Sequence, residues 1–131
     1  MLESLMSEPA FLSREQVLEL HRLSLELHGG LDGLREPGLL DSALMQPEAT
    51  YYYTQGDLAA IAGAYAFHIA QNQPFIDGNK RTAMGAALTF LKGNGVDVKK
   101  YDWNELYDAM IGIAEKRLDK AGLAEIFRRQ L

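Results

Sequence analysis

The chain contains no cysteine among its 131 residues. Without thiols, a disulfide framework, a thiolate nucleophile and a zinc site built on cysteine are all excluded. Long apolar runs are also missing. The most apolar stretch, 58–70, is far shorter than the roughly 20 residues that a membrane-spanning helix needs. Residues 1–13 lack the basic and continuously apolar regions of a secretory signal. We therefore expect a cytoplasmic protein without membrane contact.

Positive charge is scarce as well. Lys and Arg total 13 against 18 Asp and Glu, which gives a formal net charge of −5. Nucleic-acid binding depends on a basic face that contacts phosphates, so we expect no nucleic-acid partner. A hydrophobic fraction of 47% with 24% charged residues is typical of a folded globular chain. With no repeat or linker-like segment, residues 1–131 are expected to form a single domain.

Extended segments are almost absent, since only 96–100 has that character and one segment cannot make a sheet. Helical signals are frequent by contrast, beginning with a capping box at Ser13–Gln16. The predicted fold class is all-α, a compact bundle of about six helices with a central buried helix pair. The central pair is 58–70 and 79–92. The other expected helices run from the Ser13 cap to Gly29, from Pro37 through Leu44, from the Asp102 cap onward, and over 122–131, with a loop over 47–56.

The segment that joins the two central helices carries the polar residues of interest. Gly78 and Asn79 open the second helix, and Lys80 and Arg81 follow directly. A helix start presents free N–H groups and suits an anion such as phosphate, whereas cations there are unfavourable unless an anion compensates them. Asp77 could offer a hard oxygen ligand to Mg²⁺. The alternative interpretation is structural: Asp77 as an N-cap and the two cations as a solvated helix end.

Residues 65–95, YAFHIAQNQPFIDGNKRTAMGAALTFLKGNG, resemble the signature of the Doc (death-on-curing) branch of the Fic family. Its usual form is His-x-Phe-x-Asp-(Ala or Gly)-Asn-Lys-Arg-Thr-Ala, followed by an apolar helix ending in Asn-Gly. FLSREQVLELH at 11–21 and GGLDGLREPGLLDSAL at 29–44 are also similar to the family, so the resemblance covers most of 11–95. Lys80 and Met84 favour the Doc branch over the adenylyl-transferring branch, which usually has glycine and arginine at these positions.

The resemblance implies a protein kinase that uses ATP and Mg²⁺ and moves the γ-phosphate to a hydroxyl on a translation factor. Such proteins are toxins paired with a small antitoxin, so an antitoxin protein is the implied partner. Carried over by position, the site would consist of a metal ligand, an anion-binding turn, a phosphate grip and a loop anchor. These are Asp77 for the metal, Gly78 and Asn79 for the turn, Lys80 and Arg81 for the phosphates, and Phe75 for the anchor.

The chain departs from the motif at Gln73, which occupies the position of the family histidine. Glutamine can hydrogen-bond an attacking hydroxyl but cannot take its proton, and loss of a general base typically costs about a hundredfold to ten-thousandfold in rate. Three functions therefore stay open: an impaired Doc-type kinase, a non-catalytic binding module and, less favoured, an adenylyltransferase. His68 could replace the base, although a buried, hydrogen-bonded histidine is the better expectation. His21 and His28 are assigned no role.

Aromatic residues gather at two further places. Tyr51, Tyr52 and Tyr53 lie in the expected loop, where the resemblance implies a flap that binds the target protein. The alternative is that the first and third tyrosines pack on the core while the middle one faces water. Trp103, Tyr107 and Met110 share one face of the helix that follows Asp102, and we expect that face to be core.

Overall fold

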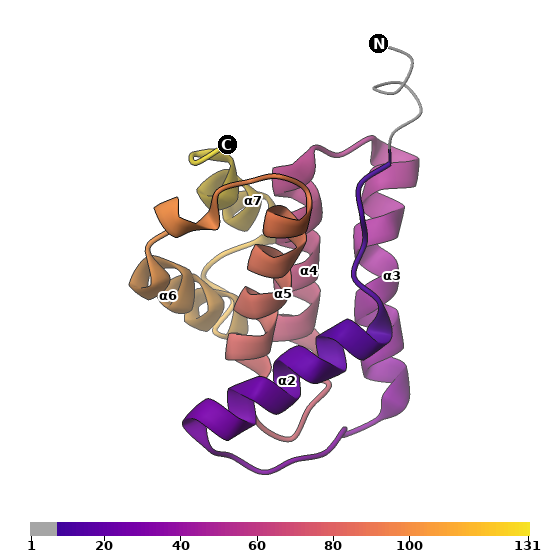
Figure 1. Ribbon diagram of the computed structural model, residues 1–131, viewed down its shortest axis with the longest axis vertical. Helices are drawn as coiled ribbons and strands as arrows, with labels where there is room; N and C mark the ends of the chain where they lie inside the picture. Colours follow the sequence, from indigo (N-terminus) through magenta and orange to yellow (C-terminus); the bar gives the residue numbers. More distant parts are fainter. Residues whose placement is uncertain (1–7) are drawn as a thin grey trace.

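The computed structural model describes residues 8–131, which form an all-α bundle (Figure 1). This confirms the predicted fold class. One isolated antiparallel bridge, between Leu34 and Phe75, joins two loops. The prediction about a secretory signal rests partly on residues 1–7, which lie outside the described residues. The helices in these 124 positions are α2 (Arg14–His28), α3 (Pro37–Thr54), α4 (Leu58–Asn72), α5 (Asn79–Gly93), the 3-10 helix η1 (Val98–Lys100), α6 (Trp103–Ala114) and α7 (Lys120–Arg128).

Helix α4 is the centre of the bundle and packs against α3, α5, α6 and α7. Figure 1 shows it between α3 on one side and α6 and α7 on the other. Small residues allow this close packing. A Cβ atom placed on Gly63 would meet the backbone of Ala124 in α7 at 3.3 Å, so any larger residue there would push the two helices apart. The predicted central pair, α4 with α5, is confirmed by the row of buried residues on both helices.

Polar caps begin several helices at the expected places. Ser13 accepts a hydrogen bond from the Gln16 amide at 3.1 Å, and the Gln16 side chain accepts one from the Ser13 amide at 2.7 Å, which completes the predicted capping box. Asp102 accepts from the backbone amides of Asn104 and Glu105 at the start of α6, also as expected. These local hydrogen bonds explain why the helix starts are readable in the sequence.

The prediction of a loop over 47–56 is wrong, because α3 continues through Pro47 to Thr54. Proline inside a helix removes one backbone hydrogen bond and normally ends or kinks the helix. Here Pro47 is buried together with Leu40, Ala43 and Thr50 on one face of α3, and α3 packs against α4. Tertiary packing of that face offsets the local cost, since most helical stability in proteins comes from such packing.

The C-terminal third also differs in detail from the expectation. Residues 98–100 form a 3-10 turn where an extended segment was expected, and the last helix begins at Lys120, capped by Asp119. In α6 the buried stripe is Leu106, Ala109, Met110 and Ile113. At 100° per residue, Trp103 and Tyr107 fall at the edge of that stripe, so Trp103 is 47% exposed and Tyr107 is half-buried. Only Met110 of the three expected core residues is in the core.

Over residues 8–131, every helix is either too short or too polar to cross a bilayer.

Candidate functional site

A polar pocket of about 270 Å³ opens where α5 begins. It brings together most of the residues singled out in the sequence and adds one that the sequence reasoning assigned to the core, Tyr107. The lining residues are Ala70, Gln73, Ile76, Asp77, Gly78, Asn79, Lys80, Arg81 and Tyr107. The pocket is thus built from the end of α4, the loop that follows, the first turn of α5 and one side chain of α6.

Gly78 and Asn79 shape the turn that starts α5. Gly78 is the N-cap in a left-handed conformation, with φ of +83°, which glycine adopts without strain. No side chain caps this helix start, so side chains leave its first N–H groups available. The Asn79 side chain is used inside the loop: its Oδ1 accepts from the Phe75 amide and its Nδ2 donates to the Phe75 carbonyl, both at 2.9 Å. Asn79 therefore fixes the turn through its side chain.

Phe75 is the anchor of the loop, and His21 of α2 holds it there. Phe75 is buried, and the His21 ring stacks on it almost in parallel, with centroids 3.7 Å apart and an angle of 8°. His21 Nε2 donates to the backbone carbonyl of Asp77 at 2.7 Å. His21 was assigned no role from the sequence. It lies four residues after buried Val17, on the inward face of α2. A polar residue at a helical position where an apolar one is expected was the sequence signal that could have identified it.

Asp77 does not cap α5, which corrects one of the two interpretations made for it. Because Gly78 takes the N-cap position, the Asp77 carboxylate turns toward the loop before α3, where Oδ2 accepts from the Leu31 amide at 2.8 Å. Gly30 permits this approach: a Cβ there would lie 3.1 Å from the Asp77 Cβ. Asp77 still lines the pocket and joins it to α2 and its following loop.

The donor set around Asp77 suits one kind of metal ion. No group of three His, Cys, Asp or Glu side chains that could hold a metal exists within the described chain. A single carboxylate does not make a dedicated metal cage. It does fit Mg²⁺ bound through one or two carboxylates, with substrate phosphates and water as the remaining ligands. The residues are therefore compatible with magnesium that arrives with a nucleotide.

Gln73 ends α4 as its C-cap in the left-handed region, with φ of 49° and ψ of 60°. Arg35 secures this turn: Nη1 donates to the Gln73 carbonyl at 2.7 Å and to the Asn72 carbonyl at 3.3 Å, and the Arg35 amide donates to the Pro74 carbonyl at 2.7 Å. The backbone at position 73 is thus held by contacts from the loop before α3, and the residue faces the pocket.

Lys80 and Arg81 supply positive charge at the start of α5. The first turn of this helix contains no acidic residue, and neither cation forms an ion pair with any carboxylate of residues 8–131. The Arg81 guanidinium carbon lies 5.4 Å from the centroid of the Tyr107 ring. Two unpaired cations at the positive end of a helix dipole repel each other and the dipole, and an anion would relieve both. Both the charge and the geometry of the pocket therefore suit an anion.

A second, larger cavity of about 700 Å³ adjoins the first at Gln73, which lines both. Its walls are the end of α4, the end of α6 and the loop between α6 and α7. The other lining residues are Phe67, Gln71, Ile113, Ala114, Lys116, Arg117, Leu118 and Asp119. Nothing in the sequence pattern predicted this cavity, because its two walls are at least 40 positions apart in the chain.

His68 lies away from the pocket and does not take the place of the motif histidine. It lines neither cavity, and its Nε2 lies 3.1 Å from Lys120 Nζ, which donates to it across the contact between α4 and α7. Partial burial, together with the Lys120 charge, lowers the pKa of His68 to about 4. At neutral pH it is an uncharged hydrogen-bond acceptor, which agrees with the structural interpretation.

The three tyrosines occupy the last turns of α3 and do not line the pocket that contains Gln73. Tyr51 packs edge-on against Phe11 and is half-buried, Tyr52 donates from its hydroxyl to Glu8 at 3.0 Å, and Tyr53 is 85% exposed. The expected alternation, with the first and third on the core, is wrong because the segment is helical and successive side chains turn by 100° instead of 180°.

Comparison with known proteins agrees with these observations. The model of the Fic/DOC family matches residues 11–91. "Protein kinase doc" of Escherichia phage P1 is 34% identical over 119 residues, which cover 90% of this chain and 93% of that protein. "Toxin Doc" of Mycolicibacterium smegmatis is 37% identical over 117 residues, which cover 87% of this chain and 88% of that protein. The chain belongs to the Fic/Doc family.

Proposed function

We propose that this chain is a Doc-type toxin: a protein kinase that moves the γ-phosphate of ATP to a hydroxyl group of a cytoplasmic translation factor, with turnover impaired by Gln73. The observation that carries the proposal is the uncapped start of α5, where Lys80 and Arg81 have no carboxylate partner within the described chain and share a pocket with Asp77 and Gln73. Phosphoryl transfer is mostly a matter of positioning and charge neutralisation, which this pocket provides.

Each residue of the pocket has a task in this proposal. The N–H groups at the start of α5 and the Lys80 and Arg81 side chains bind phosphate oxygens, and Arg81 can contact two of them at once. Asp77 would hold the magnesium ion of the nucleotide, which would supply charge neutralisation at the phosphates when bound. Loop contacts from His21 and Asn79 keep Asp77 and the turn in place before the nucleotide arrives.

The acceptor hydroxyl approaches from the larger cavity, since Gln73 forms part of both cavities. In the transfer step the hydroxyl oxygen attacks the γ-phosphorus, the bond to the bridging oxygen breaks, and ADP leaves. The hydroxyl proton must go to a base. The Gln73 amide can orient the hydroxyl by hydrogen bonding but has no basic lone pair for that proton at neutral pH, so binding is retained and the rate is reduced.

An antitoxin protein is the proposed partner. Support comes from the name of the mycobacterial relative, "Toxin Doc". With a net charge of −5, this chain would favour a partner segment that is basic.

The second candidate function is a non-catalytic module that binds a nucleotide or a protein through the same pocket, and Gln73 is the residue that favours it. Adenylyl transfer is disfavoured further by Met84, which occupies the position of the second motif arginine. Met84 is fully buried in the core, so it contributes nothing to phosphate binding.

One experiment separates the three functions. The chain and a Gln73→His variant are incubated with a translating extract and with ATP labelled either at the γ- or at the α-phosphate. We expect Gln73→His to transfer γ-label about a hundredfold or more faster than the chain itself. The Gln73→His/Asp77→Ala double variant should be inactive.

Transfer of α-label by Gln73→His would show an adenylyltransferase and overturn the assignment to the kinase branch. An inert Gln73→His variant that still binds Mg-ATP would favour the non-catalytic module.

A further inference from the structure

We infer that Tyr107 is a positioning residue of the phosphate pocket, holding the Arg81 guanidinium in place without neutralising it. This inference rests on the proposed function, because it concerns the same pocket. Tyr107 belongs to α6 and lies beyond residues 11–91, the segment that the family model matches. Neither the motif nor the family match therefore assigns it a role.

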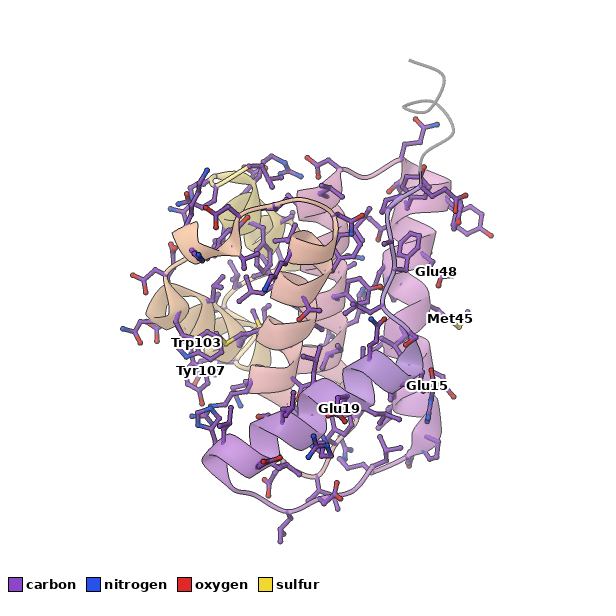
Figure 2. The ribbon with its side chains drawn as sticks, in the orientation of Figure 1. Glu15, Glu19, Met45, Glu48, Trp103 and Tyr107 are labelled. Atoms are coloured by element: carbon purple, nitrogen blue, oxygen red, sulfur yellow. The ribbon has the colours of Figure 1, made fainter. Side chains whose placement is uncertain are left out.

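The geometry brings Tyr107 into the pocket from outside the motif. It is half-buried, at the edge of the buried stripe of α6, and lines the cavity together with Gln73 and the start of α5. Its ring centroid is 5.4 Å from the Arg81 guanidinium carbon, within the range of a cation–π contact. Figure 2 labels Tyr107 on α6, on the side of the bundle where α5 begins.

No hydrogen bond within the described residues fixes the buried Nε side of the Arg81 guanidinium. Its Nε is buried and has no acceptor in the described part of the chain. Arg81 also lacks a carboxylate partner there, as described above. An aromatic ring beside the cation is the contact that remains to orient it, and within residues 8–131 Arg81 is the one cation recorded over a ring.

A ring and a carboxylate would hold Arg81 with different consequences. A carboxylate would bind the guanidinium strongly but cancel its charge, and an incoming phosphate would then compete with it. The negative face of a tyrosine ring attracts the cation through its quadrupole and carries no net charge. Contact with the face of the ring leaves the outer N–H groups of Arg81 free for two phosphate oxygens. Tyr107 thus preserves the positive charge that the pocket offers to the nucleotide.

The test measures binding of Mg-ATP and of inorganic pyrophosphate by calorimetry to the whole chain and five variants. Tyr107→Leu removes the ring and should weaken both affinities about twofold to thirtyfold, the range that corresponds to a cation–π contact. Tyr107→Phe keeps the ring and should bind like the chain itself. Trp103→Leu is the matched control, because Trp103 is an aromatic residue of the same helix that does not line the pocket, and it should leave both affinities unchanged.

The fourth and fifth variants, Arg81→Ala and Tyr107→Leu/Arg81→Ala, complete a double-mutant cycle. If Tyr107 acts through Arg81, then Tyr107→Leu should have no further effect in the Arg81→Ala background. A purely structural role would weaken binding equally in both backgrounds. Denaturant midpoints are measured alongside, and Tyr107→Met serves in place of Tyr107→Leu if the latter is not folded.

Three results would count against the inference, and they differ in what else they affect. Unchanged affinity in Tyr107→Leu with weakened binding in Arg81→Ala overturns the role of Tyr107 alone. Equal losses in Tyr107→Phe and Tyr107→Leu overturn the cation–π contact in favour of a role for the hydroxyl. A chain that binds neither ligand overturns both this inference and the phosphate site. If the expected binding pattern appears but Gln73→His transfers no γ-phosphate, the inference stands and the kinase proposal fails.

Discussion

Replacing His21 by phenylalanine should loosen the turn before α5 while keeping the ring stack on Phe75. The stack has centroids 3.7 Å apart with nearly parallel planes, and a phenyl ring can occupy the same place. The change removes the donor that lies 2.7 Å from the Asp77 carbonyl, and that carbonyl then loses its partner in a part-buried position. An unsatisfied buried acceptor costs about 1–3 kcal/mol, so the free energy of unfolding should fall by that amount.

His21→Ala should cost more, because it removes the hydrogen bond and the stack together. His21 is only 3% exposed, and the deleted ring leaves a cavity next to Phe75. Adding about 0.5–1.5 kcal/mol for the ring pair and a similar amount for the cavity to the cost of the lost hydrogen bond gives a total of roughly 2–6 kcal/mol. The difference between the two variants then measures the stack together with the cavity, and the phenylalanine variant measures the hydrogen bond.

Urea unfolding followed by circular dichroism gives both free energies, and calorimetry with Mg-ATP shows whether the loosened turn still binds phosphate. His28→Ala is the matched control, since His28 lies at the exposed end of the same helix and its loss should stay within about 0.5 kcal/mol. A His21→Phe variant that unfolds at the same urea concentration as the parent would refute the reasoning, because the hydrogen bond to Asp77 would then contribute nothing.

Three further predictions concern stability. Ala87→Leu should lower the free energy of unfolding by about 1–3 kcal/mol through overpacking, since Ala87 is fully buried in α5; an unchanged denaturant midpoint would contradict this. Lys116→Gly should raise the thermal midpoint, because Lys116 has a φ of +62° and relief of that strain contributes about 0.5–1 kcal/mol; a lower midpoint would show that no strain is present. His68 has a pKa of about 4 in the folded chain against an ordinary 6.5, so the unfolded chain binds more protons between these values and stability should fall as pH drops from about 6.5 to 4. Urea titrations should show that His68→Gln removes roughly 1–2 kcal/mol of this dependence, a value reduced for the solvent that reaches the half-buried ring; an equal slope in both proteins would exclude His68 as its source.

Local signals explain which parts of the molecule could be predicted from the sequence. The central pair α4 and α5 was readable from its apolar pattern, and most of the pocket lies within the short stretch from Gln73 to Arg81, so sequence proximity already placed those residues together. The extension of α3 was missed because Pro47 is a strong local signal for a helix end, whereas the buried face that keeps the helix intact depends on contacts made elsewhere in the chain.

Two residues of the site, His21 and Tyr107, were not predicted from the sequence, because each reaches the site through a tertiary contact. His21 reaches Asp77 across 56 positions, and Tyr107 reaches Arg81 from α6, a helix outside the residues that carry the resemblance to the family motif. The sequence pattern shows that a histidine lies on the apolar face of a helix, or that an aromatic residue lies at the edge of that face. It does not show whether these side chains pack on the core or on the loop of the pocket. Only the packing of α2 and α6 on the start of α5 separates these cases.

The left-handed backbone at Gln73 bears on how easily this chain could gain or lose turnover in evolution. Histidine is one of the few residues, besides glycine, asparagine and aspartate, that is enriched in this conformation, and Arg35 holds the turn through main-chain carbonyls that any side chain would leave in place. Codons for glutamine and histidine differ by a single third-position base. Under the proposed mechanism, a slow and a fast form of the protein are therefore separated by one nucleotide and by almost no folding penalty. Under that mechanism, Gln73→His would raise the rate of transfer without a compensating change elsewhere in the fold.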